Sequence, residues 1–156
     1  MSKFLAKLNN LGIELPDPPT PSANYIPAKL VGNLVYVSGQ IPLQDGREAF
    51  VGKVGADVSV QQAQVAARIC AINILAQLNK ALDGDLDRVR SVVRLGGFVN
   101  ATETFSDHPT VINGASDLMV AVFGDSGRHA RAAVGTSSLP HNSAVEVEGI
   151  FEIDLQ

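Results

Sequence analysis

One cation and two carboxylates interrupt the most sheet-like part of this 156-residue chain. Arg131 stands near the start of the run ARAAVGTSSL, and Glu146 and Glu148 alternate with apolar residues in AVEVEGIFEI. A guanidinium presents a planar pair of donors that matches a carboxylate, and a nearby glutamate can orient a water molecule. Two interpretations of Arg131 stay open from these residues alone: a paired charge at a subunit interface, which is the commoner case, or an anchor for a small anionic ligand.

The histidines and the single cysteine carry weaker signals. His108, His129 and His141 lack the spacing of metal ligands, so no metal site is expected. His129 is the one to watch, because it precedes Arg131 by two residues and can reach the same pocket. Cys70 falls beside the apolar stripe of a predicted helix, where we expect a small core residue rather than a nucleophile.

The composition limits the class of protein to which this chain can belong. The chain is 46% hydrophobic and 18% charged, as a folded globular domain is, and its net charge is −4 with Lys and Arg scattered. A nucleic-acid partner is therefore disfavoured. No apolar run approaches the roughly 18 residues that a membrane span needs, and the N-terminal stretch is not a secretory signal. The length predicts one domain over residues 1–156. A single cysteine cannot form an internal disulfide and suits a reducing compartment, so we expect a cytoplasmic protein.

An N-terminal arm and a hairpin are predicted first along the chain. Residues 1–20 form the arm, with a short amphipathic helix over 3–11 followed by the proline-rich connector PDPPTPS. Two extended runs flank Gly32 and Asn33, a two-residue turn signal, and predict a β-hairpin. On the second strand of this hairpin, Val35 and Val37 take one face, and Leu34, Tyr36 and Ser38 take the other.

Two helices and an intervening strand are predicted between residues 59 and 123. Ser59 and Gln62 can form a capping box for the first helix, whose wide apolar face is expected to pack on a sheet. One stripe of that face comprises Val65, Ile69, Ile72 and Ala76. The alternation in RVRSVVRLGGFVN predicts a strand with a bulge at Gly96–Gly97. Helical spacing then predicts a second helix over 108–123.

The last two strands complete the order ββ, α, β, α, ββ. Two helices covering one face of a mixed sheet give a two-layer α+β domain. The other face of the sheet also needs cover, and oligomerisation into a symmetric ring is the simplest solution. The valines to be distributed over the sheet are Val35, Val37, Val134, Val145 and Val147.

Three blocks of the sequence resemble the RidA family, also called the YjgF family and in places endoribonuclease L-PSP. They are GNLVYVSGQIP at 32–42, HARAAVGTSSLP at 129–140 followed by VEVEGI, and the weaker TVINGASDLM at 110–119. Together these blocks enclose most of the chain from Tyr25 to Ile153. It implies a chorismate-mutase-like α+β fold, a homotrimer with ligand clefts between subunits, and no metal or organic cofactor.

The resemblance also implies an activity, the hydrolysis of reactive enamines and imines to 2-keto acids and ammonia. The family's carboxylate-binding arginine falls on Arg131, its water-orienting glutamate on Glu146 and its cleft-lining tyrosine on Tyr25. Glu148 is the less favoured carboxylate, because only Glu146 matches the motif. The further positions implied to contact substrate are Ser38, Gly39, Asn113 and Ala133, the last replacing a cysteine common in archetypal members.

Other functions stay open beside this one. The same cleft can bind a 2-keto acid or a related small carboxylate as a sensor, without turnover. A ribonuclease, implied by the older family name, is disfavoured by the acidic chain and its few aromatic residues. The chain is longer than archetypal members, with inserted residues near 47–55 and 101–106 that can reshape or cap the cleft.

Overall fold

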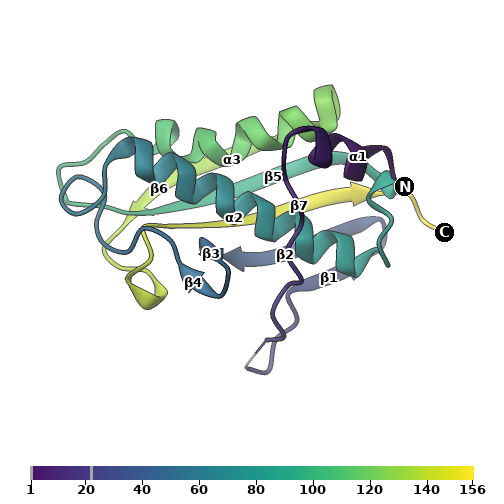
Figure 1. Cartoon of the computed structure of the whole chain (residues 1–156), viewed down its shortest axis with the longest axis horizontal. Helices are drawn as coiled ribbons and strands as arrows, with labels where there is room; N and C mark the ends of the chain where they lie inside the picture. The colour runs from purple at the N-terminus through teal and green to yellow at the C-terminus, as the bar shows by residue number, and fades with distance from the viewer. Residues whose placement is uncertain (1, 22) are drawn as a thin grey trace.

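The two longest helices lie across one face of a five-stranded sheet and confirm the predicted two-layer α+β fold (Figure 1). The computed structural model describes residues 2–21 and 23–156. The elements are α1 (Lys3–Asn10), β1 (Ala28–Val31), β2 (Leu34–Gln40), β3 (Leu43–Gln44), β4 (Arg47–Glu48), α2 (Val60–Ala81), β5 (Val89–Asn100), α3 (His108–Phe123), β6 (Ala130–Thr136) and β7 (Val145–Ile153). None of the helices in the described part of the chain is long and apolar enough to cross a bilayer.

The sheet has the strand order β1-β2-β7-β5-β6. Its pairs are antiparallel apart from β5 and β6, which run parallel because α3 carries the chain back across the sheet between them. The predicted β1–β2 hairpin is confirmed, with Val31 paired to Leu34 across its two-residue turn. The small β3–β4 hairpin, Leu43–Gln44 with Arg47–Glu48, was not predicted.

The predicted start of α2 is confirmed, but part of its predicted apolar stripe is wrong. The Gln62 amide donates to Ser59 Oγ at 3.1 Å, and the Ser59 amide donates to Gln62 Oε1 at 3.0 Å. Ile69 and Ala76 are buried, whereas Val65 is 48% exposed and Ile72 is only partly buried. The buried side of α2 runs through Ala63, Ala67, Cys70, Ile74 and Leu78, which places positions 65 and 72 on the opposite side of the helix.

Helices α2 and α3 cross so closely that Gly114 has no room for a side chain. A Cβ at this position would overlap the Gln64 carbonyl oxygen on α2. The same turn is tied by the Gln64 side-chain amide, which donates to the Thr110 carbonyl at 2.9 Å. The contact holds α3 over β5 and β6, where it can support the side chains of β6.

We expect Gly114→Ala to destabilise the protein by about 2 kcal/mol or more, because the added methyl must push the two helix backbones apart. Glycine-to-alanine changes inside a helix ordinarily stabilise by about 1 kcal/mol, so the sign itself is diagnostic. Urea unfolding followed by circular dichroism measures the effect. Asp117→Ala, an exposed change one turn further along α3, serves as the control. A Gly114→Ala protein as stable as the wild type would contradict this description of the helix crossing.

The predicted strand at β5 is confirmed, but its bulge is not where the sequence placed it. The register with β7 shifts between Val89 and Ser91 and again between Val92 and Arg94, while the ladder is regular through Gly96–Gly97. The two glycines are instead required by close neighbours: a Cβ on Gly97 would lie 2.6 Å from the Ile112 side chain. A Cβ on Gly96 would lie 2.8 Å from Glu148 Oε1 on the other face of the sheet.

The N-terminal arm packs on the end of the domain, as predicted. Leu8 of α1 is buried in the core, and the Phe4 ring meets Phe123 edge to face with centroids 4.7 Å apart. Asp87 holds the start of α1, since it accepts from Ser2 Oγ at 2.6 Å and from the Lys3 amide at 2.9 Å. Residues 12–21 then cross the molecule toward the edge at β1 (Figure 1). The sequence therefore delivers residues 23–27 to the far face of the sheet.

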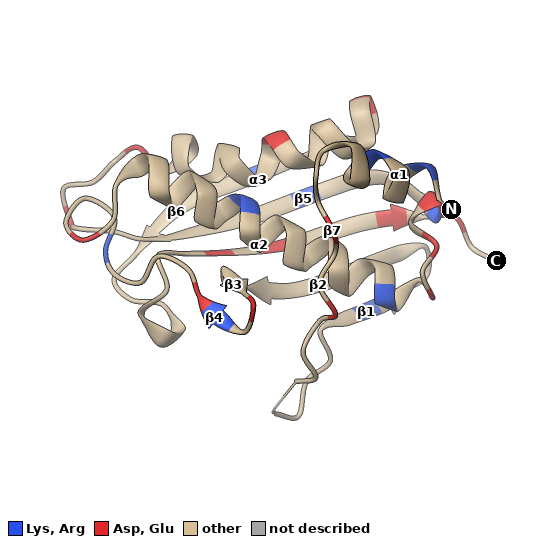
Figure 2. Ribbon diagram, viewed as in Figure 1, with Lys and Arg blue, Asp and Glu red and all other residues tan. Residues whose placement is uncertain are grey.

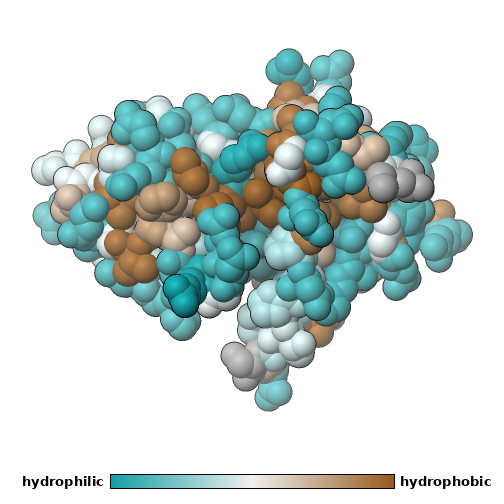
Figure 3. Space-filling view, viewed as in Figure 1, coloured by the Kyte–Doolittle hydropathy of each residue, from teal (hydrophilic) through white to brown (hydrophobic). Residues whose placement is uncertain are grey.

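The sheet face away from α2 and α3, called the open face below, is more polar than the sequence analysis expected. Val35, Val37, Val145 and Val147 are all buried beneath the helices, and only Val134 is exposed. The alternate positions of β7 instead bring Glu146, Glu148, Ile150 and Glu152 to the open face. On the helix-bearing side, apolar residues form a band interrupted by hydrophilic ones (Figure 3). Lys and Arg are dispersed along the fold among Asp and Glu (Figure 2).

Candidate functional site

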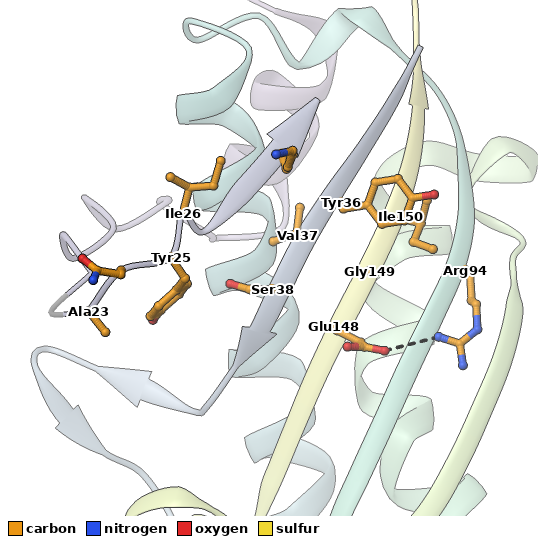
Figure 4. A pocket seen from close by; sticks show the side chains of 12 residues that line it. Ala23, Tyr25, Ile26, Tyr36, Val37, Ser38, Arg94, Glu148, Gly149 and Ile150 are labelled. Atoms are coloured by element: carbon orange, nitrogen blue, oxygen red, sulfur yellow. Dashed lines mark hydrogen bonds and ion pairs between the residues drawn. The ribbon is translucent and has the colours of Figure 1, made fainter. Parts of the chain in front are cut away.

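A pocket with a volume of about 850 Å³ lies on the open face. Residues 23–26 form one wall, and β2, β7 and β5 form the floor (Figure 4). Tyr25 and Ser38, both predicted site residues, line it together with Tyr36 and Ile150. The pocket combines an apolar floor with a few polar groups, which is typical of small-molecule sites.

An ion pair that the sequence analysis missed crosses this pocket. Arg94 Nη1 lies 3.4 Å from Glu148 Oε1, and both side chains are about two-fifths exposed (Figure 4). The sequence analysis placed Arg94 in a predicted strand and gave it no role in the site. The register shift between Val92 and Arg94 is what brings this arginine level with β7, and no local sequence signal marks that shift.

Ser38, Gly39 and Glu146 meet at an irregularity in β2. The ladder between β2 and β7 shifts between Val37 and Gln40, so the strand bends away from β7 at Ser38–Gly39. The Glu146 carboxylate occupies this bend, and a Cβ on Gly39 would overlap its Oε1 atom. Ser38 Oγ is buried and has no hydrogen-bond partner among residues 2–21 and 23–156. The bend therefore holds a carboxylate beside a free hydroxyl.

The surroundings of Glu146 favour its neutral form. Burial is the larger cause and the negative charge of Glu148 the smaller, and both raise the pKa of the Glu146 carboxyl. A carboxylate with a raised pKa is a stronger base than a free one, which suits a group that orients and deprotonates water.

The raised pKa predicts a pH-dependent gain in stability for Glu146→Gln. A carboxyl whose pKa is raised by folding favours the folded state while it is protonated, and this contribution is lost as the pH rises through the folded-state pKa. At pH 7 the ionised group destabilises, so the glutamine variant should melt at a higher temperature. The gain should vanish below about pH 4, where glutamate is protonated in both states. Differential scanning calorimetry from pH 3.5 to 8 tests it, and Glu152→Gln on the same face of β7 is the control. A stability gain that is constant with pH would refute the assignment.

Arg131 lies on the opposite face of the sheet from Glu146. Its backbone pairs with Leu95, which is fully buried beneath the helices. The guanidinium reaches α3, where Nη1 donates to Asn113 Oδ1 at 2.7 Å and to Ser116 Oγ at 3.1 Å. Nε and Nη2 make no hydrogen bond or ion pair within the described residues. Two predicted site residues, Arg131 and Asn113, are thus brought together, with a donor pair left free.

Of the remaining candidates, Ala133 and His129 lie near Arg131, whereas His108 and His141 contact other residues. Ala133 lies two residues beyond Arg131 on the same face and packs against the core. His129 is close to Arg131, as expected from its position, and hydrogen-bonds to Ser116 at 2.9 Å. His108 packs its ring on Phe105, and His141 lies 3.2 Å from Glu48 at the surface.

Cys70 is a core residue, as predicted. It is fully buried, its thiol donates to the Val145 carbonyl at 3.7 Å, and burial raises its pKa. A protonated, inaccessible thiol is inert as a nucleophile. Within residues 2–21 and 23–156, no three His, Cys, Asp or Glu side chains gather closely enough to hold a metal ion.

The two-layer α+β fold carries a carboxylate on the open face and an arginine on the edge strand β6, and similarity to known proteins places the chain in a family. Residues 5–153 match the YjgF/chorismate-mutase-like family, described as "putative endoribonuclease". The chain belongs to this family, which confirms the resemblance drawn from the three sequence blocks.

Particular relatives match along nearly the whole chain. Protein TCP17 of Trypanosoma cruzi is 45% identical over 97% of this chain and 95% of its own. The crystal structure of Atu1372 from Agrobacterium tumefaciens, a protein of unknown function, superposes with a TM-score of 0.92 at 51% identity, over 97% of this chain and 93% of that one. A 2-iminobutanoate/2-iminopropanoate deaminase of Dermatophagoides farinae is 29% identical over 91% of this chain and 95% of its own.

Proposed function

We propose that this protein hydrolyses small imino acids, and the enamines in equilibrium with them, to 2-keto acids and ammonia. One observation carries the proposal: the Arg131 guanidinium is fixed by α3 through Nη1 alone, and its Nε–Nη2 edge is left to bind a carboxylate. An imino acid carries that carboxylate directly beside the reactive carbon. The deaminase among the relatives supports the same reaction class.

The chemistry needs little beyond positioning. Arg131 binds the substrate carboxylate, and Glu146 accepts a proton from a water molecule whose oxygen attacks the imine carbon. The product of attack is a carbinolamine, in which carbon bears both a hydroxyl and an amino group. The imine nitrogen takes up one proton as water adds and a second as the carbinolamine collapses, while the hydroxyl group gives up its proton. The C–N bond then breaks, ammonia leaves and a keto group remains. Tyr25 can donate to the departing nitrogen, and Ser38 Oγ can hydrogen-bond to the substrate.

Two half-sites on different subunits are needed for this arrangement. Tyr25, Ser38, Gly39 and Glu146 belong to the first, on the open face. Asn113, Arg131 and Ala133 belong to the second, at the outer edge of β6 and facing α3. Since the two half-sites lie on opposite faces of one sheet, we propose that the second half-site of one protomer meets the first half-site of its neighbour in a homotrimer. A ring of heterologous contacts repeats this junction around its axis.

The free thiol of Cys70 fits a cytoplasmic location.

A coupled assay tests the function. A pyridoxal-phosphate-dependent dehydratase generates 2-aminoacrylate or 2-iminobutanoate, and lactate dehydrogenase with NADH reports the keto acid released. The expected result is faster keto-acid release than the spontaneous hydrolysis measured without the protein. Unchanged rates together with saturable binding of pyruvate by calorimetry would instead identify a carboxylate sensor. Cleavage of a labelled RNA, with no effect on imine hydrolysis, would overturn the proposal in favour of a ribonuclease.

A further inference from the structure

A chain of hydrogen bonds extends from Arg131 to Ser116 and His129, to which the sequence analysis assigned no role in the site. His129 Nδ1 lies 2.6 Å from the Gly127 carbonyl oxygen, and His129 Nε2 lies 2.9 Å from Ser116 Oγ. Ser116 Oγ in turn receives the Arg131 Nη1 donor at 3.1 Å. The four groups come from α3, from the turn that follows it and from β6, so they join three consecutive elements.

The direction of each hydrogen bond follows from the chemistry of its ends. A carbonyl oxygen only accepts, so the proton of a neutral His129 ring is on Nδ1, and Nε2 is left as an acceptor. The Ser116 hydroxyl must then donate to Nε2, which turns its lone pairs toward Arg131. Arg131 Nη1 donates to one of them, so both ring nitrogens of His129 and the Ser116 hydroxyl have partners, while Arg131 Nε and Nη2 stay free.

We propose that Ser116 and His129 are positioning residues for Arg131 that hold its guanidinium in the orientation that binds the substrate carboxylate. This inference rests on the proposed function for its consequence, although the contacts exist independently of it. Asn113 alone fixes one point on Nη1, about which the guanidinium can still swing. Ser116 supplies a second point, and His129 prevents the Ser116 hydroxyl from rotating its proton toward the arginine. A guanidinium that is already held in place loses less conformational freedom on binding a carboxylate than one that is free to rotate.

The effect should appear in ligand affinity rather than in folding. Alanine is a better helix former than serine, so Ser116→Ala in α3 should leave the melting temperature equal or higher. Its dissociation constant for pyruvate and its KM for the imino acid should each rise about fivefold to tenfold, as expected for the loss of one hydrogen bond of ordinary strength. The value of kcat should change less than KM, because the water that Glu146 orients is untouched.

Matched variants at His129 separate positioning from packing. His129→Gln keeps an acceptor near the position of Nε2 and should retain most of the affinity for pyruvate. His129→Leu has a similar volume but no acceptor, and should bind pyruvate as weakly as Ser116→Ala. Equal affinities for the wild type, Ser116→Ala and His129→Leu would overturn the inference and leave the proposed function standing.

A measurement without ligand keeps the two proposals distinguishable. The rotation of the Arg131 guanidinium about its Nε–Cζ bond can be followed by ¹⁵N NMR. We expect slow rotation in the wild type and in His129→Gln, and faster rotation in Ser116→Ala and His129→Leu. Fast rotation in the wild type would overturn the inference. Slow rotation in a wild-type protein that binds no pyruvate and hydrolyses no imine would support the positioning role while refuting the proposed function.

Discussion

Arg131→Ala is expected to lower kcat/KM for imino-acid hydrolysis by about 100- to 1,000-fold, since it removes a bidentate charge-assisted contact and the orientation that this contact gives the substrate. The fold should survive, because Arg131 is partly exposed and its neighbours Asn113 and Ser116 can be hydrated in its absence. The coupled keto-acid assay gives the rate, and a melting curve verifies the fold.

Two further variants make the arginine prediction specific. Arg131→Lys keeps the positive charge but loses the planar fork, so its rate should fall between those of wild type and Arg131→Ala. Arg128→Ala removes another arginine three residues away, which pairs at the surface with Asp125 at 3.5 Å. It should leave the rate unchanged. If Arg128→Ala and Arg131→Ala reduced the rate alike, general electrostatic attraction would explain the result and the carboxylate clamp would not.

Mixing two inactive variants is expected to restore activity. Arg131→Ala keeps the first half-site intact, and Glu146→Gln keeps the second. In a trimer that contains both variants, in either proportion, about one site in three combines an intact Glu146 with an intact Arg131 from the neighbouring subunit. Co-expression of the two variants with different affinity tags, followed by tandem purification, gives the mixed oligomers, and the coupled assay measures the recovery.

The outcome of the mixing experiment tests the division of the site directly. A recovery near a third of the wild-type rate supports a junction between subunits. If Arg131 and Glu146 of one chain served the same site, each site of a mixed trimer would lack one of the two, and the rate would stay at the level of the single variants. Co-expression of two copies of Arg131→Ala with the same two tags controls for residual activity.

Local sequence signals predicted the elements well. The capping box at Ser59, the turn at Gly32–Asn33 and the bounds of α3 each depend on a few neighbouring residues, and the structure confirms them. The predictions that were wrong depend on distant partners. The buried side of α2 is set by where α3 crosses it, and the register of β5 is set by β7. Neither partner is encoded near the residues concerned.

The sequence predicted which residues form the candidate site, but it did not predict the face of the sheet on which each of them lies. The motif blocks picked out Arg131, Asn113 and Glu146, and the structure brings the first two into contact. The faces of the sheet were not predictable at β6, because ARAAVGT is small or apolar on both sides and lacks the polar alternation of β7. The spacing of His129 from Arg131 pointed to the same pocket, but its contact with Ser116 was not predictable, since it depends on the turn between α3 and β6.

The outer border of β6 has a consequence for the lifetime of a lone subunit. Within residues 2–21 and 23–156, β6 pairs only with β5, so one row of its backbone amides and carbonyls faces outward along a stretch of small residues. Such a bare ladder is a template for uncontrolled strand addition. In the proposed trimer a neighbouring subunit would cover this border, so we expect isolated chains to aggregate more readily than assembled ones, and the yield to depend on chain concentration during synthesis.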